Sequence, residues 1–95
     1  MTDPLFSIPM IERFIGFDTI SRNSNLPLIH FVRDYLSDLG IESILTHDVT
    51  GEKANLFATL GPKDKPGIVL SGHTDVVPCE DQNWTSDPFT LAKLD

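Results

Sequence analysis

The sequence has few of the features that mark secreted or membrane proteins. It contains one cysteine, Cys79, and therefore cannot form an internal disulfide. No apolar run approaches the roughly 20 residues that a membrane-spanning helix needs, so we expect no membrane partner. Residues 1–4 lack the basic and apolar regions of a secretory signal peptide. These absences predict a cytoplasmic protein, where a reducing environment suits a free cysteine.

Basic residues are also scarce. Seven Lys and Arg stand against fourteen Asp and Glu, for a net charge of −7. Such a surface repels a phosphate backbone, so we expect no nucleic acid partner. A hydrophobic fraction of 40% argues against disorder. The 95 residues suffice for one small domain, residues 1–95, and leave no room for a second.

Two helices are predicted in the first 40 residues. Residues 7–17 carry apolar side chains on one face at helical spacing. Residues 18–25 are rich in side chains that hydrogen-bond their own backbone, which predicts a loop. The second helix has the clearer pattern, with Asn25 as its cap, a continuous apolar stripe, and Gly40 as a left-handed stop.

Three strands are predicted after Gly40, because the apolar period changes there. They are residues 41–46, residues 54–60 and residues 68–71, separated by turns rich in glycine and polar residues. The third strand is apolar almost throughout, which is typical of a strand covered on both faces. The order helix, helix, strand, strand, strand predicts an α/β fold.

A histidine and an aspartate stand two residues apart in "LSGHTDVVP", residues 70–78. On an extended backbone, His73 and Asp75 share one side of the chain. A histidine that binds a metal through one ring nitrogen usually donates its other N–H to a partner such as a carboxylate. Asp75 is spaced to be that partner, and its carboxylate could instead be a metal ligand itself.

The pair alone fits a surface hydrogen bond equally well. Its position at the end of the third predicted strand favours the metal site, because α/β proteins place their chemistry in loops that follow buried strands. The other two histidines give no support. His30 falls on the exposed face of the second helix and His47 in a turn, so neither is assigned a role.

Longer strings carry a family resemblance. "GHTDVVP" at residues 72–78, followed by "WTSDPF" at residues 84–89, resembles the N-terminal signature of the M20 family of dinuclear zinc amidohydrolases and peptidases. Within that family, residues 17–36 and 53–61 are similar to the members that deacetylate N-acetyl-L-ornithine. The resemblance runs from about residue 8 to the end of the sequence.

The resemblance implies a fold and a division of labour. The fold is the N-terminal portion of a zinc-peptidase-like catalytic domain with a mixed sheet. His73 matches the ligand of one zinc of a pair, a position that also accepts cobalt or manganese. Asp75 matches the acid that orients His73. Residues 84–89 match a segment that shapes the approach to the site, whereas Cys79 and residues 80–81 depart from the family pattern.

The implied reaction is hydrolysis of N-acetyl-L-ornithine to L-ornithine and acetate, a step of arginine biosynthesis. Two metals would polarise the acetyl carbonyl and activate a water, with a glutamate as general base. The partner is a small N-acylated amino acid, and a full-length protein is expected to form a homodimer.

The remaining metal ligands and the general base match no residue of this chain. We therefore expect a fragment that is inactive alone and leaves apolar faces and a sheet edge exposed. Two alternatives stay open: a non-catalytic interaction or regulatory module derived from a truncated hydrolase, and a segment of a related M20 deacylase or peptidase.

Overall fold

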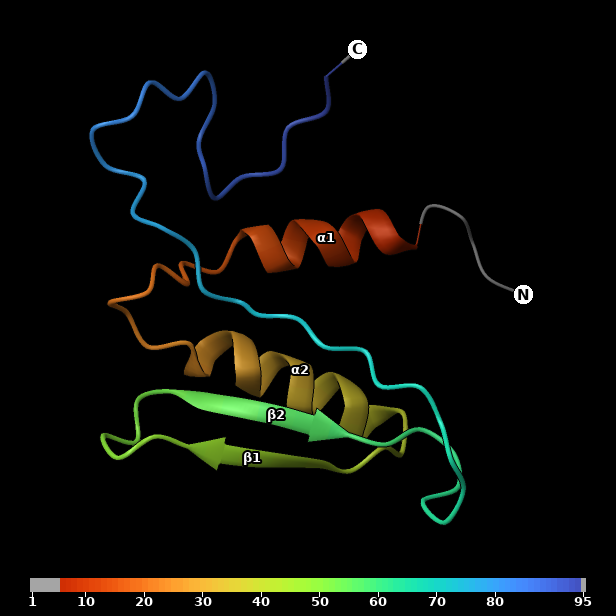
Figure 1. Ribbon diagram of the computed structural model, residues 1–95. Coiled ribbons are helices and arrows are strands. Elements are labelled where there is room, and N and C mark those ends of the chain that lie inside the picture. The colour runs from red at the N-terminus through yellow and green to blue at the C-terminus, as the bar shows by residue number, and fades with distance from the viewer. Residues whose placement is uncertain (1–5, 95) are drawn as a thin grey trace.

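The computed structural model describes residues 6–94. The prediction that the chain lacks a signal peptide concerns residues 1–4, which lie outside the described residues. Within the described part, Figure 1 shows two helices followed by a hairpin of two strands and a long C-terminal segment without regular structure. The elements are α1 (Ser7–Ile15), α2 (Leu26–Asp38), β1 (Ser43–His47) and β2 (Ala54–Ala58). The α/β class predicted from the sequence is confirmed.

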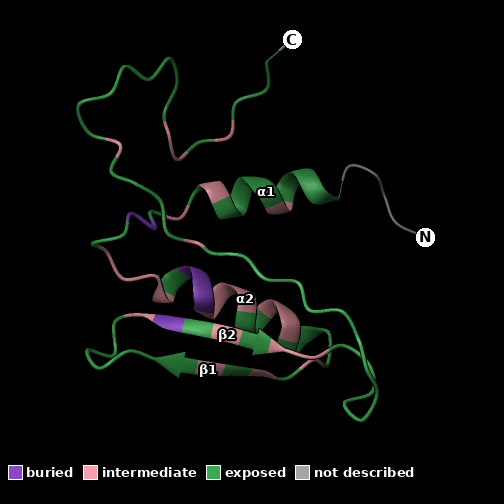
Figure 2. Cartoon of the chain, in the orientation of Figure 1, coloured by how far each residue is buried: buried purple, intermediate pink, exposed green. Residues whose placement is uncertain are grey.

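The core lies between α2 and the hairpin. Figure 2 shows the few buried residues on α2, at the start of β2 and in the α1–α2 loop. Leu28 and Ile29 of α2, each 6% exposed, pack with Ala54 of β2, which is 4% exposed. The partly buried residues packed against this cluster are Phe17, Leu26, Val32, Leu45 and Leu56. The apolar stripe of the second helix thus covers one face of the hairpin.

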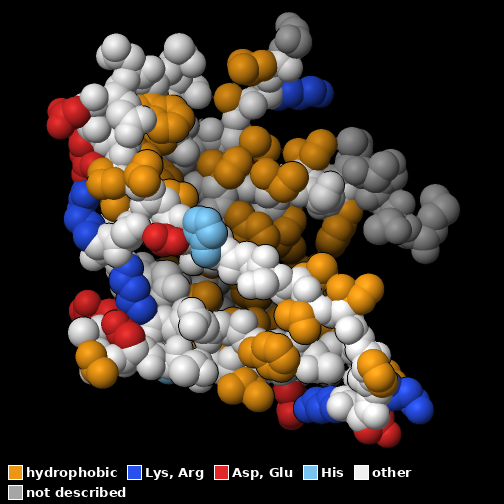
Figure 3. Space-filling view, viewed as in Figure 1, with side chains coloured by type: hydrophobic (Ala, Val, Ile, Leu, Met, Phe, Trp, Pro, Cys, Tyr) orange, Lys and Arg blue, Asp and Glu red, His pale blue; other side chains and the backbone are white. Residues whose placement is uncertain are grey.

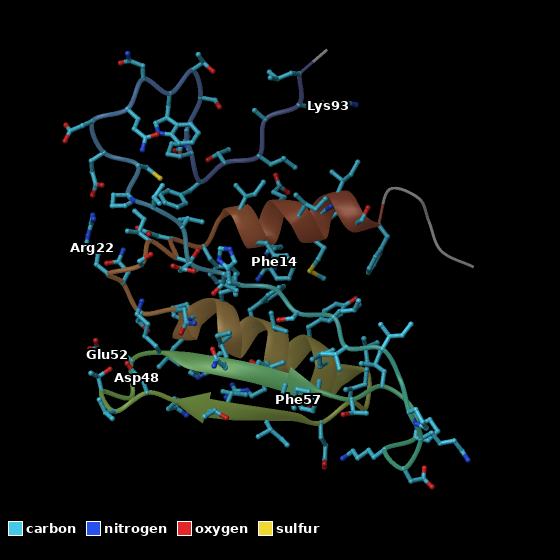
Figure 4. All side chains as sticks on the ribbon, in the orientation of Figure 1. Phe14, Arg22, Asp48, Glu52, Phe57 and Lys93 are labelled. Carbon is cyan, nitrogen blue, oxygen red and sulfur yellow. The ribbon has the colours of Figure 1, made fainter. Side chains whose placement is uncertain are left out.

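The two strands pair antiparallel, with Ser43 opposite Ala58 and His47 opposite Ala54. The Asp48 carboxylate closes their turn, accepting hydrogen bonds from the Thr50 hydroxyl at 2.8 Å and the Gly51 N–H at 3.0 Å. These bonds, that of Thr50 first, hold the pKa of Asp48 below its ordinary value of 3.8. Figure 4 shows Asp48 in this turn, at the end of the hairpin where β1 leads into β2.

Element boundaries follow the backbone chemistry of a few residues. Helix α1 stops at Ile15, two residues before the predicted end. Gly40 has a φ of 78° and ends the second helix in the left-handed conformation predicted for it. Asn25 stands at the start of α2, but its side chain makes no capping hydrogen bond. Instead its amide bonds the Ala54 backbone twice, each time at 3.0 Å, and ties α2 to β2.

The predicted third strand over residues 68–71 is wrong. Within residues 6–94 the sheet has two strands, which pair antiparallel with each other, and residues 68–71 pair with neither of them. Ile68 and Leu70 are 91% and 93% exposed. An apolar run becomes a covered strand only when neighbouring strands and helices lie against it, and the described residues supply none. The mixed sheet is likewise not seen in them, although an isolated parallel bridge joins Ile20 to Val76.

Apolar side chains are exposed elsewhere too, as expected from the sequence. None of the described residues of α1 is buried. The Phe14 ring packs edge-on against the Phe31 ring, with 6.0 Å between the ring centroids, yet Phe14 remains 41% exposed. Figure 3 shows hydrophobic side chains spread over the visible face. Across residues 6–94, no helix has both the length and the apolar character needed to cross a membrane.

Candidate functional site

His73 and Asp75 meet as the two-residue spacing predicts. Nδ1 of His73 lies 2.9 Å from Oδ1 of Asp75. An ionised carboxylate only accepts hydrogen bonds, so this contact places the proton of a neutral imidazole on Nδ1. Nε2 then keeps its lone pair. Because the His73 side chain is 83% exposed, an incoming metal can reach that nitrogen.

The carboxylate of Asp75 is held on its other oxygen by Ser21. The Ser21 hydroxyl donates to Oδ2 of Asp75 at 2.8 Å and also lies 3.2 Å from the Val76 carbonyl oxygen. The Ser21 hydroxyl first, and then His73, hold the pKa of Asp75 below its ordinary value of 3.8. Asp75 is therefore ionised at neutral pH, and each of its oxygens has a protein partner.

Backbone contacts tie the same two segments together. The Ser21 N–H donates to the Val76 carbonyl at 3.0 Å, and the Val76 N–H donates to the Thr19 carbonyl at 3.1 Å. The Thr19 hydroxyl adds a bond of 2.6 Å to the Thr74 carbonyl. Thr19 and Ile20 are 8% and 4% exposed, so this contact is one of the buried parts of the chain.

Sequence reasoning assigned residues 18–25 to a loop and missed this role for Thr19 and Ser21. The signal that could have found it is short: Thr19, Ile20 and Ser21 alternate polar, apolar and polar, the pattern of a half-buried strand. Three residues are too few to distinguish a bridge from a loop without the partner segment.

Charged side chains flank the contact. Arg22 forms an ion pair with Glu80, and this bond holds the pKa of Glu80 below its ordinary range. The Lys53 ammonium donates to the Ser21 carbonyl from the end of the β1–β2 turn, immediately before β2. Figure 4 shows Arg22 on the loop that joins α1 to α2. This loop therefore contacts both the hairpin and the segment that carries His73.

The loop that follows the His73 segment folds back on itself. The Trp84 indole N–H donates to the Cys79 carbonyl at 3.2 Å, and the Asp87 carboxylate accepts from the Phe89 N–H at 2.8 Å. A largely apolar groove of about 640 Å³ opens between this loop, α1 and His73. The groove is lined by residues that include Phe14, Val76, Trp84, Pro88 and Phe89.

Among the residues that the structure describes, the donor set fits one ligand position of a metal centre. Within residues 6–94, no group of three or more His, Cys, Asp and Glu side chains could hold a metal ion. His30, on α2, and His47, at the end of β1, join no such group in that part of the chain. A catalytic zinc usually takes three protein ligands, and its histidines donate their second N–H to a partner. The His73–Asp75 pair has the second property.

Comparisons with known proteins identify the chain's relatives. No family model and no solved structure matches it. It is 42% identical over 74 residues to the acetylornithine deacetylase of Shigella sonnei (strain Ss046). It is 40% identical over 80 residues to that of Pectobacterium carotovorum subsp. carotovorum (strain PC1), and 44% identical over 73 residues to that of Photorhabdus laumondii subsp. laumondii.

These matches cover most of this chain but a small part of each relative. They include 76–82% of this chain but only 19–20% of each relative. The chain thus spans about a fifth of the length of the curated relatives that it matches. The resemblance inferred from the sequence motifs is confirmed: the chain is similar to one segment of three acetylornithine deacetylases.

Proposed function

We propose that the chain contributes His73, as a metal ligand, and Asp75, as the acid that orients it, to an amidohydrolase site that deacetylates N-acetyl-L-ornithine. The observation that carries the proposal is the 2.9 Å contact between Nδ1 of His73 and Oδ1 of Asp75 on an exposed segment. The names of the three relatives supply the reaction and the acylated amino acid as substrate.

The two side chains have separate tasks. Asp75 keeps the proton on Nδ1, so that the Nε2 lone pair of His73 is available to zinc, cobalt or manganese. Polarisation of the amide carbonyl is the chemistry that such a bound metal supplies. In the overall reaction a water oxygen bonds to the acetyl carbon, the carbon–nitrogen bond breaks, and the amine of L-ornithine takes up a proton.

The proposal extends to the setting of the reaction. We assign zinc as the metal, arginine biosynthesis as the pathway, the cytoplasm as the location and a homodimer as the full-length assembly, all by the family resemblance. Because the described residues hold one metal ligand, we expect the 95-residue chain alone to be inactive.

A chimera tests the proposal. The matching segment of this chain replaces its counterpart of 74 aligned residues in the Shigella sonnei relative, and hydrolysis of N-acetyl-L-ornithine is measured with metal content. His73→Ala is expected to lower metal content and activity together. Asp75→Ala is expected to lower activity by roughly 10- to 100-fold, with a smaller loss of metal, because it removes an orienting partner.

The matched control is His30→Ala, which removes an imidazole from α2 and should leave metal content and activity unchanged. Equal activity of the unmodified chimera and of its Asp75→Ala variant would contradict the orienting role of Asp75. A folded, metal-loaded chimera without activity, beside an active relative, would contradict the assigned substrate.

A further inference from the structure

The hydroxyl of Ser21 occupies a place in the site that the proposed function does not explain. Ser21 lies 54 residues from Asp75 in the sequence, yet its Oγ is 2.8 Å from Oδ2 of that carboxylate. The opposite oxygen, Oδ1, faces the His73 ring at 2.9 Å. The three side chains therefore form one continuous chain of hydrogen bonds, from Ser21 through Asp75 to His73.

We propose that Ser21 is a positioning residue that fixes the Asp75 carboxylate and, through it, the tautomer and orientation of the His73 ring. This inference rests on the proposed function, because it concerns how the metal-binding nitrogen is presented.

The argument begins with the freedom of the carboxylate. The side chains of Asp75 and His73 are 58% and 83% exposed, so packing alone does not hold them. A carboxylate bound through one oxygen can turn about its carbon–carbon bond, whereas one bound through both oxygens has a defined plane. The Ser21 bond to Oδ2 supplies the second point.

The position of Ser21 is itself well defined. Its N–H donates to the Val76 carbonyl at 3.0 Å, next to the bridge between Ile20 and Val76, and Ile20 is buried. Lys53 donates to the Ser21 carbonyl from the other side. Ser21 is thus anchored by its backbone to the segment that carries Asp75, and this anchor keeps its hydroxyl within hydrogen-bonding distance of the carboxylate.

The test measures the tautomer of His73 without metal, in the 95-residue chain carrying Leu70→Lys, a change of an exposed apolar residue that limits self-association in every sample. Long-range ¹⁵N NMR of the imidazole rings, at a pH where they are neutral, gives the ratio of Nδ1–H to Nε2–H for each histidine. The wild-type chain is expected to hold His73 mainly as Nδ1–H, in contrast to His30 and His47, which serve as internal references. Ser21→Ala is expected to lower the His73 ratio by up to about fivefold, the factor that complete loss of one ordinary hydrogen bond would give.

Two further variants separate a positioning role from a general effect on folding. Ser21→Thr keeps the hydroxyl and should restore the wild-type ratio. Thr50→Ala removes a matched hydroxyl from the Asp48 carboxylate in the β1–β2 turn, and should leave His73 unchanged. If Ser21→Ala fails to fold, Ser21→Cys, nearly isosteric and a weak donor, is measured with a reductant present and should lower the ratio in the same direction.

An unchanged His73 ratio in a folded Ser21→Ala or Ser21→Cys chain would overturn the inference, as would an equal change in Thr50→Ala. Because no metal or substrate enters this experiment, such a result would leave the proposed deacetylase function standing. Conversely, failure of the chimera to bind metal through His73 would not alter the measured tautomer ratio.

Discussion

Thr19 and Thr74 are joined by a hydrogen bond of 2.6 Å across 55 residues of sequence. Thr19, the donor, is a buried residue that is 8% exposed, so the bond is among the protected contacts that hold the His73 segment in place. Thr19→Val keeps the shape of the side chain but removes the donor. Amide hydrogen exchange at Val76, whose N–H bonds the Thr19 carbonyl, should become about fivefold faster, as expected for about 1 kcal/mol.

Thr46→Val is the control for that measurement, because Thr46 is an exposed residue of β1. It should leave exchange at Val76 unchanged. If the two valine variants accelerated exchange at Val76 equally, the Thr19 hydroxyl would have no special part in holding the segment.

A second prediction concerns the Asn25 amide, which exchanges two hydrogen bonds with the Ala54 backbone. Asn25→Asp keeps the shape but replaces the donor with an acceptor that faces the Ala54 carbonyl oxygen. We expect Asn25→Asp to lower the free energy of unfolding by about 1–3 kcal/mol, because Ala54 is buried and its carbonyl oxygen loses the donor of its hydrogen bond. Denaturant titration measures the change. Asn55→Asp, the same charge change at an exposed residue of β2, should cost much less; equal losses would contradict this account.

The Asp48 turn should respond to acid. The pKa of Asp48 is lowered in the folded chain, so its contribution to stability is present above the ordinary value of 3.8 and is lost as the pH falls through the lower folded value. The amide shifts of Gly51 and Lys53 should therefore move together in that acidic range. In Asp48→Asn this step should disappear, whereas Asp64→Asn, in the next turn, should preserve it. A step that survives in Asp48→Asn would assign the transition to another group.

The helices and the hairpin could be predicted because their signals are local. The stripe of α2 repeats within 13 residues, and the strands of the hairpin are separated by a single turn. The third strand could not, because strand pairing depends on distant partners, and none of the described residues pairs with residues 68–71 in the sheet. The apolar side chains of residues 68–71 indicate that other elements should pack against them, but they do not identify those elements.

The candidate site divides in the same way. The His73–Asp75 contact follows from the alternation of side chains over three residues, so the sequence predicts it. The contacts of Thr19 and Ser21 cross more than 50 residues and carry no sequence signal of that kind. Asp81 lies between these cases. It has a φ of 61°, a left-handed conformation that favours glycine and that aspartate tolerates, at one of the two positions, 80–81, that depart from the family pattern.

The exposed apolar segment predicts poor behaviour of the isolated chain. Ile68 and Leu70 present apolar side chains and unpaired backbone groups to solvent. We expect the chain to be marginally stable or to self-associate at micromolar concentration, as measured by sedimentation velocity. Leu70→Lys should reduce the association, whereas Val49→Lys, which changes an equally exposed residue in the β1–β2 turn, should not. A monomer with a sharp, reversible thermal transition would contradict the prediction.

The central claim is that Nε2 of His73 binds the metal while Nδ1 stays bonded to Asp75. The most direct measurement is NMR of the chimera loaded with ¹¹³Cd in place of zinc, with ¹⁵N in its histidine rings. The account predicts a one-bond coupling between cadmium and Nε2 of His73, and a proton retained on Nδ1. Bound cadmium that couples to Nδ1, or that shows no coupling to His73, would contradict it.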